Sequence, residues 1–427
     1  MDCGLCAQTC PAKEKALVMK PLADQRPQCE HMWDFARQNI SMKPMADQKI
    51  TVKTSQFLQP LNEFSGSCAG CGETPYAKLL TQLYGDRMMI SNPAGCTAVW
   101  AAGAPSVAYT VNDKGQGPAW SYSLFEDCGE YGFGILLGME YERDRVADMI
   151  KAVLAKGVAG ELKAAMEDWL ANAKNGEGTR ARAERLAKAL GQAKGQNPLY
   201  AELLALEKFF IKRSMWVFGG DGWAYDIGFG GLDQVLSFGQ DLNIFVFDTE
   251  VYSNTGGQAS KATPTGAIAQ FAAAGRKGRK KDLGTMAMTY GNVYVAQIAM
   301  GADRAHTLKT IQEAEAYPGT SLIIAYAPCI SHGIKGGMAN SQEQTKRAVE
   351  SGYWHMYRYN PLLKDEGKNP FILDSKEPKF DLLKDYLMSE VRYSALYQKF
   401  PAQADAVIAE AIRNAKERYE SYLRLLK

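Results

Sequence analysis

An aspartate and a threonine that each follow a short apolar run are the residues of this sequence best suited to chemistry. Asp221 closely follows the run 215–218, and Thr249 closely follows the run 242–247, which places the two residues 28 positions apart. Short runs rich in Val, Ile and Phe are typical of buried parallel strands. The carboxyl ends of such strands meet at one edge of a sheet, so Asp221 and Thr249 are predicted to lie together there.

A hard cation such as Mg²⁺ suits this pair of side chains. Mg²⁺ prefers oxygen ligands, and it readily takes diphosphate oxygens beside them. Asp221, Thr249 and a nearby backbone carbonyl would supply half of its ligands, and the diphosphate of a cofactor would supply the rest. Gly219, Gly220 and Gly222 would let the backbone approach the phosphates, and residues 253–257 offer further donors. Gly-Asp-Gly by itself is equally common as a plain turn.

The cysteines form a second set of chemical residues. There are nine, several at short spacings, and this pattern in a chain that starts without a signal-like segment favours metal ligation and a reducing cytoplasmic location. Cys3-x2-Cys6-x3-Cys10-Pro11 is the end of the ferredoxin pattern C-x2-C-x2-C-x3-C-P, whose first cysteine would fall just before Met1. We therefore expect residues 1–30 to be a truncated ferredoxin-like segment.

Four other cysteines are ambiguous when taken alone. The pair Cys68-x2-Cys71 fits a zinc knuckle or a redox dithiol as well as a cluster, and Cys96 and Cys329 fit small apolar fillers. Glu73, which precedes a helical stretch, fits an acid in the first turn of a helix.

The rest of the sequence predicts the elements that position these residues. Apolar runs recur at residues 292–296 and 321–326, and residues 224–240 contain a glycine-rich turn followed by a helical stretch. This alternation predicts a doubly wound α/β fold with a mostly parallel sheet. About residues 139–212 are rich in Ala, Lys, Glu and Arg, which predicts a helical insertion broken at residues 175–178.

Composition shifts divide the chain into a ferredoxin-like remnant (1–30), a connector (31–64), a catalytic domain (65–362) and a carboxy-terminal tail (363–427). The amphipathic end of the tail, residues 402–426, is expected to pack on a partner subunit or on domains outside this chain. The basic run 276–281 is expected to be a solvated loop.

The overall charge argues against two classes of partner. The chain has 49 Lys and Arg against 47 Asp and Glu, a net charge of +2, which is too balanced to suggest nucleic acid. No apolar run approaches the roughly 18 residues that a membrane span needs.

Two longer motifs indicate a family. Gly-Asp-Gly with Thr249 resembles the diphosphate-binding motif of thiamine diphosphate enzymes. The strings GDGWAYDIGFGG at residues 220–231 and DTEVYSNTGGQ at residues 248–258 resemble one family among them, the pyruvate:ferredoxin (flavodoxin) oxidoreductases. The resemblance covers roughly residues 65–362 and points to the carboxy-terminal part of such an enzyme.

The resemblance implies an α/β domain of the thiamine diphosphate-binding type, and it implies roles for particular residues. Asp221, Thr249 and the Val251 carbonyl would bind Mg²⁺, and Glu73 and Asn254 would be catalytic. Cys68, Cys71, Cys96 and Cys329 would hold the 4Fe-4S cluster nearest the thiamine, Cys3, Cys6 and Cys10 would belong to partial ferredoxin-like clusters, and Cys29 and Cys128 would be structural. The implied cofactor-binding residues are Glu73, Cys96, Gly220, Asp221, Gly222, Trp223, Thr249, Glu250, Val251, Tyr252, Ser253 and Asn254.

The implied reaction is the oxidative decarboxylation of pyruvate to acetyl-CoA and CO₂, with electrons passed through 4Fe-4S clusters to ferredoxin or flavodoxin. Coenzyme A is then a substrate, and the full enzyme is expected to be a homodimer. The glutamate that activates the thiamine in this family lies in an amino-terminal domain that these residues do not resemble, so we expect the chain to be inactive alone. Two alternatives remain open: a different 2-oxo acid, such as 2-oxoglutarate or indolepyruvate, and an electron-transfer module without thiamine chemistry.

Overall fold

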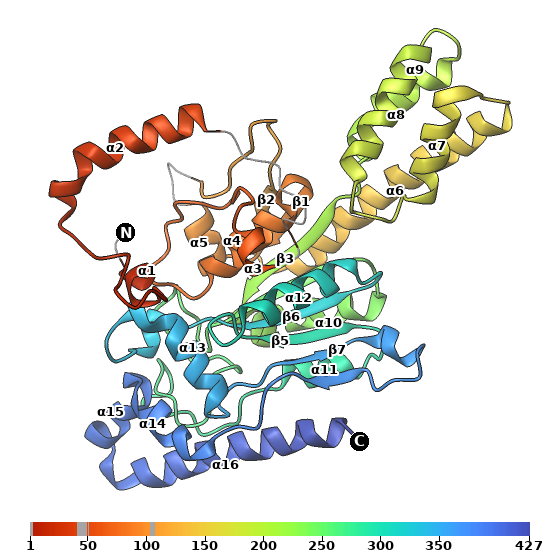
Figure 1. Cartoon of the computed structure of the whole chain (residues 1–427). Coiled ribbons are helices and arrows are strands. Elements are labelled where there is room, and N and C mark those ends of the chain that lie inside the picture. The colour runs from red at the N-terminus through yellow and green to blue at the C-terminus, as the bar shows by residue number, and fades with distance from the viewer. Residues whose placement is uncertain (1–2, 41–48, 50, 103–106) are drawn as a thin grey trace.

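An eight-stranded sheet forms the centre of the molecule (Figure 1). The computed structural model describes residues 3–40, 49, 51–102 and 107–427. The sheet has the order β2-β1-β3-β4-β6-β5-β7-β8. The first six strands are parallel to one another, β7 pairs antiparallel with β5, and β8 pairs antiparallel with β7. The strands are β1 (Met88–Asn92), β2 (Ala119–Tyr122), β3 (Ser214–Gly220), β4 (Asn243–Asp248), β5 (Tyr294–Ile298), β6 (Ser321–Tyr326), β7 (Tyr357–Tyr359) and β8 (Phe371–Leu373).

Helices cover both faces of this sheet, which confirms the predicted doubly wound, mostly parallel α/β fold. Alternate residues of the central strands enter two cores, because successive side chains of a strand point to opposite faces. Trp216 and Phe218 of β3 join the core on one face, and Met215 and Val217 join the core on the other. Burying a side chain of this size stabilises the fold by about 1.5–3 kcal/mol.

The helices divide between the two faces. The first face is covered by α3 (Val52–Ser55), α4 (Thr74–Tyr84), α5 (Cys96–Ala101) and α12 (Arg304–Ala316). The second face is covered by the start of α6 (Cys128–Ala155), α10 (Phe229–Phe238), α11 (Leu283–Met288), α13 (Ser341–Glu350), α14 (Leu383–Met388), α15 (Val391–Lys399) and α16 (Pro401–Leu425). None of the helices in the described part of the chain has both the length and the apolar character that crossing a bilayer requires.

The strand predictions are confirmed, with ends shifted by two residues at β5 and by one or two residues at β3 and β4. The predicted turn at Gly228 to Gly231 is partly wrong, since Gly230 and Gly231 lie in the first turn of α10. A Cβ on Gly231 would strike the Glu130 carboxylate of α6, so this glycine serves a close helix contact and not a turn. Near the amino end, α1 (Leu5–Gln8) is followed by α2 (Leu22–Asn39), and α2 runs across the predicted boundary between remnant and connector.

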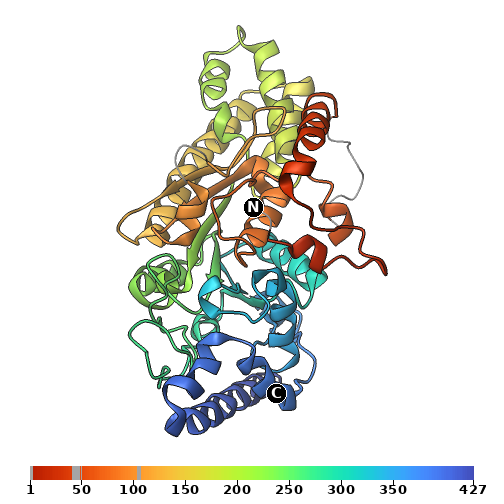
Figure 2. The same ribbon diagram turned by 90° about the vertical axis from the view of Figure 1, so that its left-hand side faces the viewer.

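The helical insertion forms an arm that projects from one end of the sheet (Figures 1 and 2). It contains the second half of α6, together with α7 (Gly160–Ala171), α8 (Thr179–Ala193) and α9 (Pro198–Ala205). These helices share a core of their own, which includes Ile150, Met166, Trp169 and Leu186. The insertion was predicted to begin at about residue 139, but α6, the helix that leads into the arm, begins at Cys128. Its first turns pack on the sheet. A Cβ on Gly132 would come within 2.9 Å of Val217.

A buried ion pair lies where the arm meets the body. Arg87, which directly precedes β1, pairs with Glu315 of α12 at 2.6 Å, and their side chains are 4% and 12% exposed. The same guanidinium donates to the Lys212 carbonyl at the base of the arm. Gly176, between α7 and α8, also lies against Arg87, since a Cβ at this position would come within 2.5 Å of the guanidinium. Arg87 therefore joins the sheet, α12 and the arm.

Replacing Arg87 with methionine is expected to lower the free energy of unfolding by about 3–5 kcal/mol, because the Glu315 carboxylate would be left buried without its partner. Urea unfolding followed by circular dichroism measures this loss. The matched control is Arg145→Met, since the Arg145–Glu142 pair is 54% and 28% exposed and its loss should cost less than about 1 kcal/mol. Equal losses for the two variants would contradict a stabilising role for Arg87.

The carboxy-terminal helix packs on the chain's own core, so the expectation that it awaits a partner is wrong for this helix. Ala404, Ile408 and Tyr422 of α16 are buried in the second core. The Tyr422 hydroxyl also donates to Asp282 at 2.9 Å. The apolar face predicted for residues 402–426 is thus buried against the second core of this chain.

Candidate functional site

Four neighbouring parallel strands end at one edge of the sheet, and each is followed by a predicted site residue. In sheet order, β1 leads to Cys96, β3 to Asp221, β4 to Thr249 and β6 to Cys329. The register between β3 and β4 pairs Gly220 with Phe247, which aligns the ends of these two strands. Ligands of open α/β sheets bind at this carboxyl edge.

The predicted neighbours Asp221 and Thr249 are in direct contact. The Asp221 Oδ1 atom accepts hydrogen bonds from the Thr249 hydroxyl at 2.9 Å and from the Thr249 amide at 3.1 Å. The Asp221 Oδ2 atom accepts a third bond from Ser260 Oγ at 2.6 Å. Burial, followed by the charge of Asp248, raises the pKa of Asp221 well above its usual range. Ser260 was not predicted, because it lies in a loop without a recognisable motif.

Three kinds of oxygen converge on the Thr249 hydroxyl. Besides the Asp221 carboxylate, the Val251 carbonyl lies 3.1 Å away and Ser253 Oγ lies 2.7 Å away. A hydroxyl has one hydrogen to donate, so it cannot satisfy the carboxylate and the carbonyl at once. A carboxylate, a hydroxyl and a carbonyl this close together form the oxygen-rich surface that a hard cation prefers.

Two glycines beside Asp221, Gly219 and Gly222, are required by aromatic neighbours. A Cβ on Gly219 would strike the ring of Trp223, and a Cβ on Gly222 would strike the ring of Tyr252. Trp223 is itself buried, and its Nε1 atom donates to the Glu126 carbonyl at 3.0 Å. At Gly220, in contrast, the nearest atom to an added Cβ would be 4.0 Å away, which leaves room beside the backbone.

The predicted cluster cysteines lie near one another and near Glu73. Burial, followed by the charges of Glu73, Cys329, Cys71 and Cys68, raises the pKa of the Cys96 thiol far above its usual range. The Gly72 amide, next to Cys71, donates to the Pro328 carbonyl, next to Cys329, at 3.1 Å. The chain thus brings four cysteines from three distant segments to one place.

Two of these thiols also accept backbone hydrogen bonds. The Glu73 amide donates to Cys71 Sγ at 3.5 Å, and the Ser331 amide donates to Cys329 Sγ at 3.4 Å. Across the described residues, no three His, Cys, Asp or Glu side chains are grouped so that they could hold a metal ion. A four-iron cluster is larger than one ion, and its cysteine ligands surround it at wider spacing.

Glu73 is a buried acid at the start of α4. Trp100 Nε1 donates to Glu73 Oε2 at 2.7 Å, and burial outweighs this bond and raises the pKa of Glu73 to about 7. Glu73 is the N-cap residue of this helix, but its side chain makes no capping hydrogen bond. Asn254, in contrast, is exposed, and its amide donates to the Ala94 carbonyl at 3.4 Å, close in sequence to Cys96.

The amino-terminal cysteines lie near α1, which packs against the turn Met338–Asn340. Cys6 is exposed, and Cys3 and Cys10 are partly exposed. The backbone amides of Ala12, Leu17 and Ala16 lower the pKa of the Cys10 thiol. Of the two cysteines predicted to be structural, Cys128 is buried and Cys29 is exposed on α2.

A network of buried charges lies behind the Asp221–Thr249 pair. Lys280 contacts Asp248 at 2.7 Å and Glu250 at 2.9 Å, and all three side chains are at most 5% exposed. Arg392 of α15 contacts Glu250 at 2.8 Å and Glu390 at 2.7 Å. The expectation that residues 276–281 form a solvated loop is therefore wrong for Lys280, which is a buried ion-pair partner.

His332 lies near the cluster cysteines in sequence but contacts the threonine loop. Its Nε2 atom lies 2.7 Å from the Thr249 carbonyl, and burial lowers the pKa of His332 to about 4. A neutral imidazole whose Nε2 carries the hydrogen would donate to this carbonyl. The contact links the loop that contains Cys329 to the loop that contains Thr249.

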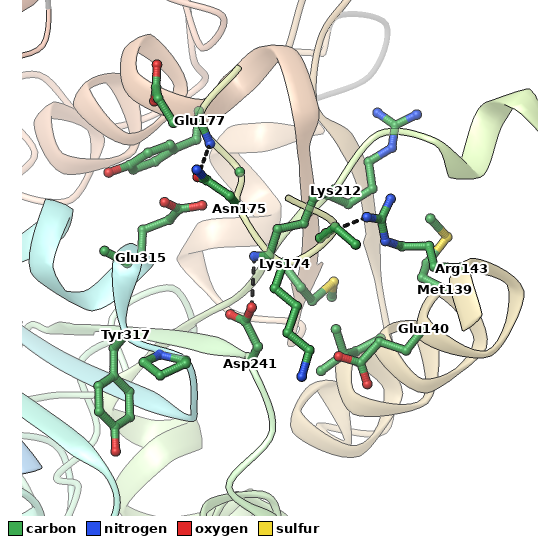
Figure 3. A pocket seen from close by; sticks show the side chains of 18 of the residues that line it. Met139, Glu140, Arg143, Lys174, Asn175, Glu177, Lys212, Asp241, Glu315 and Tyr317 are labelled. Carbon is green, nitrogen blue, oxygen red and sulfur yellow. Dashed lines mark hydrogen bonds and ion pairs between the residues drawn. The ribbon is translucent and has the colours of Figure 1, made fainter. Parts of the chain in front are cut away.

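A cavity of about 930 Å³ lies elsewhere, between the arm and the amino ends of the strands. Residues such as Met139, Arg143 and Asp241 line it (Figure 3). Lys212 and Asp241, which line it, pair at 2.8 Å. Its described lining contains none of the predicted site residues.

Comparisons with known proteins agree with the motifs. Residues 186–325 match the family described as "Thiamine pyrophosphate enzyme, C-terminal TPP binding domain". The chain is 56% identical over 425 residues to the pyruvate-flavodoxin oxidoreductase of Klebsiella pneumoniae and 56% identical over 431 residues to that of Enterobacter agglomerans. It is 52% identical over 428 residues to the pyruvate:ferredoxin oxidoreductase of Moorella thermoacetica.

Each of these three alignments covers 99% of this chain and 36% of the relative. The chain therefore spans little more than a third of the length of the relatives that it matches. The resemblance predicted from the motifs at residues 220–231 and 248–258 is confirmed. Over nearly all of its own length, the chain is similar to one part of these pyruvate-flavodoxin and pyruvate:ferredoxin oxidoreductases.

Proposed function

We propose that this chain is the thiamine diphosphate-binding and cluster-binding part of a pyruvate:ferredoxin (flavodoxin) oxidoreductase. The observation that carries the proposal is the meeting of two residue sets at one sheet edge. Cys96 and Cys329 follow β1 and β6, and Asp221 and Thr249 follow the two strands between them. The match of residues 186–325 to a thiamine pyrophosphate-binding family supports the same conclusion.

The charges of the site support a divalent cation. Four buried carboxylates, those of Asp221, Asp248, Glu250 and Glu390, belong to one network with two buried cations, Lys280 and Arg392. Burial, followed by the charge of Asp248, raises the pKa of Asp221, so its ionised form is unfavourable without a nearby cation. Mg²⁺ held by Asp221, Thr249 and the Val251 carbonyl would supply that cation.

The proposed diphosphate site lies next to these oxygens. Gly220 leaves room beside the backbone, and Gly222, Trp223, Tyr252 and Ser253 lie around Asp221 and Thr249. The backbone amides of such a glycine-rich segment are suited to binding phosphate oxygens.

The proposed 4Fe-4S site consists of Cys68, Cys71, Cys96 and Cys329. Burial keeps the thiols of Cys71 and Cys96 protonated when no metal is present, since it raises the pKa of each. Iron binding would hold them as thiolates, and the backbone amides that donate to Cys71 and Cys329 resemble the hydrogen bonds that tune cluster potentials. We propose in addition that Cys3, Cys6 and Cys10 contribute to ferredoxin-like clusters.

The proposed reaction is the oxidative decarboxylation of pyruvate to acetyl-CoA and CO₂, with ferredoxin or flavodoxin as the electron acceptor. When bound, thiamine diphosphate would supply a carbon nucleophile and the clusters would accept single electrons. Glu73, whose pKa of about 7 lets it hold or release a proton near neutral pH, and Asn254, whose amide is exposed at the same edge, would position the cofactor and the substrate. We propose a cytoplasmic homodimer for the full enzyme, in which the remaining sequence completes the active site.

Titration of the chain with thiamine diphosphate tests the proposal. Isothermal titration calorimetry should show saturable binding that depends on Mg²⁺. After anaerobic reconstitution with iron and sulfide, the chain should also hold a 4Fe-4S cluster. Pyruvate-dependent dye reduction is expected only when the rest of the enzyme is supplied. A chain that binds neither group, or one that reduces dye alone, contradicts the proposal.

A further inference from the structure

The turn between the two proposed Mg²⁺ ligands has an unfavourable backbone conformation. Glu250 lies between Thr249 and Val251, and its φ angle is +62°. A residue with a Cβ rarely adopts this left-handed conformation, which is the conformation that glycine adopts without cost. Strained residues of this kind persist where their surroundings hold them and tend to occur at functional sites.

This conformation places two oxygens on the same side of the chain. The Thr249 hydroxyl lies 3.1 Å from the Val251 carbonyl, two residues later, and 2.9 Å from Asp221. If residue 250 relaxed to a negative φ, the direction of the Val251 carbonyl relative to the Thr249 side chain would change. The position of these oxygens therefore depends on the backbone of residue 250.

Side chains from three distant segments hold Glu250 in place. Its carboxylate, 1% exposed, contacts Lys280 at 2.9 Å and Arg392 at 2.8 Å, and it accepts a hydrogen bond from the Tyr353 hydroxyl. Its backbone is held as well, because the amide donates to Asp248 at 3.1 Å and the carbonyl accepts from Thr263. The Tyr353 hydroxyl also accepts a bond from Arg392, which joins two of the three partners.

We propose that Lys280, Arg392 and Tyr353 form a clamp that holds Glu250 in its left-handed conformation and so prepositions Thr249 and Val251 for the cation and diphosphate. The inference rests on the proposed function, because it assigns the clamp to that site. Glu250 is then a positioning residue, anchored away from the cofactor. Buried ion pairs of this kind are often no more stabilising than apolar residues of similar size, so a positioning role accounts for them better than stability does.

The test compares two variants that remove the same carboxylate, Glu250→Gly and Glu250→Ala. Without the clamp, alanine is expected to relax to a negative φ, so binding must restore the strained turn. Glycine adopts the turn freely. The left-handed conformation costs a residue with a Cβ about 1–2 kcal/mol, so the glycine variant should bind thiamine diphosphate and Mg²⁺ roughly 5- to 30-fold more tightly than the alanine variant.

Calorimetric titration of the full chain with thiamine diphosphate at saturating Mg²⁺ measures both affinities, and circular dichroism checks the folding of each variant. Equal affinities, or tighter binding by the alanine variant, would overturn the clamp while leaving the proposed function intact. Failure of the unaltered chain to bind would overturn the proposed function and the clamp with it.

A milder variant keeps the inference testable if Glu250→Ala does not fold. Tyr353→Phe retains the ring and removes only the hydroxyl that contacts Glu250 and Arg392, and it should weaken binding about tenfold, the usual effect of losing a hydrogen bond to a charged group. Tyr294→Phe is the matched control, because its hydroxyl donates to the Glu313 carboxylate of α12 at 2.9 Å, on the other face of the sheet from Tyr353. Equal affinities of these two variants would refute the clamp.

Discussion

Replacing Asp221 with asparagine is expected to weaken the Mg²⁺-dependent binding of thiamine diphosphate by at least about 100-fold. The outer partners of metal ligands alone contribute 10- to 100-fold to affinity, so the loss of a direct carboxylate ligand should exceed that range. The amide keeps the size of the side chain but removes the charge that attracts the cation. Its NH₂ group would also face Thr249 or Ser260, which both donate to the carboxylate. Calorimetric titration measures the affinity.

Asp233→Asn is the matched control for this variant. Asp233 is an exposed aspartate on α10 whose carboxylate accepts a bond from Tyr290. Its replacement should leave cofactor affinity unchanged. In the absence of cofactor the Asp221→Asn chain should still fold, because burial already opposes the charge on Asp221 and so offsets part of the cost of turning an NH₂ group toward the Thr249 and Ser260 donors. If Asp221→Asn retains the affinity of the unaltered chain, Asp221 is not a Mg²⁺ ligand.

The Cys96→Ser variant is expected to lose the 4Fe-4S cluster nearest the sheet edge almost completely. Cys96 is the first residue of α5, shortly after β1 ends. This segment contains no second cysteine that could replace it as a ligand. A serine hydroxyl remains protonated at neutral pH and is a poor substitute for the thiolate that iron–sulfur clusters require. Iron and sulfide analysis after anaerobic reconstitution measures the loss, and the EPR signal of the reduced protein identifies the cluster.

Cys29→Ser controls for the general loss of a thiol. Cys29 is exposed on α2, and its replacement should leave the iron content and the EPR signal unchanged. The thiamine diphosphate affinity of Cys96→Ser should stay within a few-fold of that of the unaltered chain, since Asp221 and Thr249 lie on other strands. Equal cluster contents in the Cys96→Ser and Cys29→Ser proteins would contradict the assignment of Cys96.

The central fold was predictable because its signals are local. The apolar runs at residues 215–218 and 242–247 are short, β-branched and aromatic, and they became β3 and β4 almost as predicted. The contact between Asp221 and Thr249 followed from parallel topology, since adjacent parallel strands end together. Cys96 and Cys329 also follow parallel strands, β1 and β6, but only the family resemblance had assigned them to this site.

Other features depended on contacts between residues far apart in the chain. The run 276–281 has the composition of a solvated loop, yet Lys280 is buried because Asp248 and Glu250 lie where the folded loop passes. An amphipathic pattern predicts that one face of a helix is buried, but it does not predict what that face packs against. The sequence of residues 402–426 therefore could not show that α16 packs on the core of this same chain. The sequence did not show that the insertion is continuous with the body, because α6 is one helix that packs on the sheet at one end and on the arm at the other.

The sequence by itself predicted that Asp221 and Thr249 meet at the carboxyl edge of the sheet, because strand periodicity and motif spacing are properties of neighbouring residues. Only the tertiary structure decided what holds them in position. Ser260, Lys280, Arg392 and Tyr353 reach the site from loops and helices whose docking depends on the whole core, and no local pattern specifies which buried charges pair. The left-handed conformation of Glu250 is likewise imposed by these distant partners, since nothing in its own identity favours it.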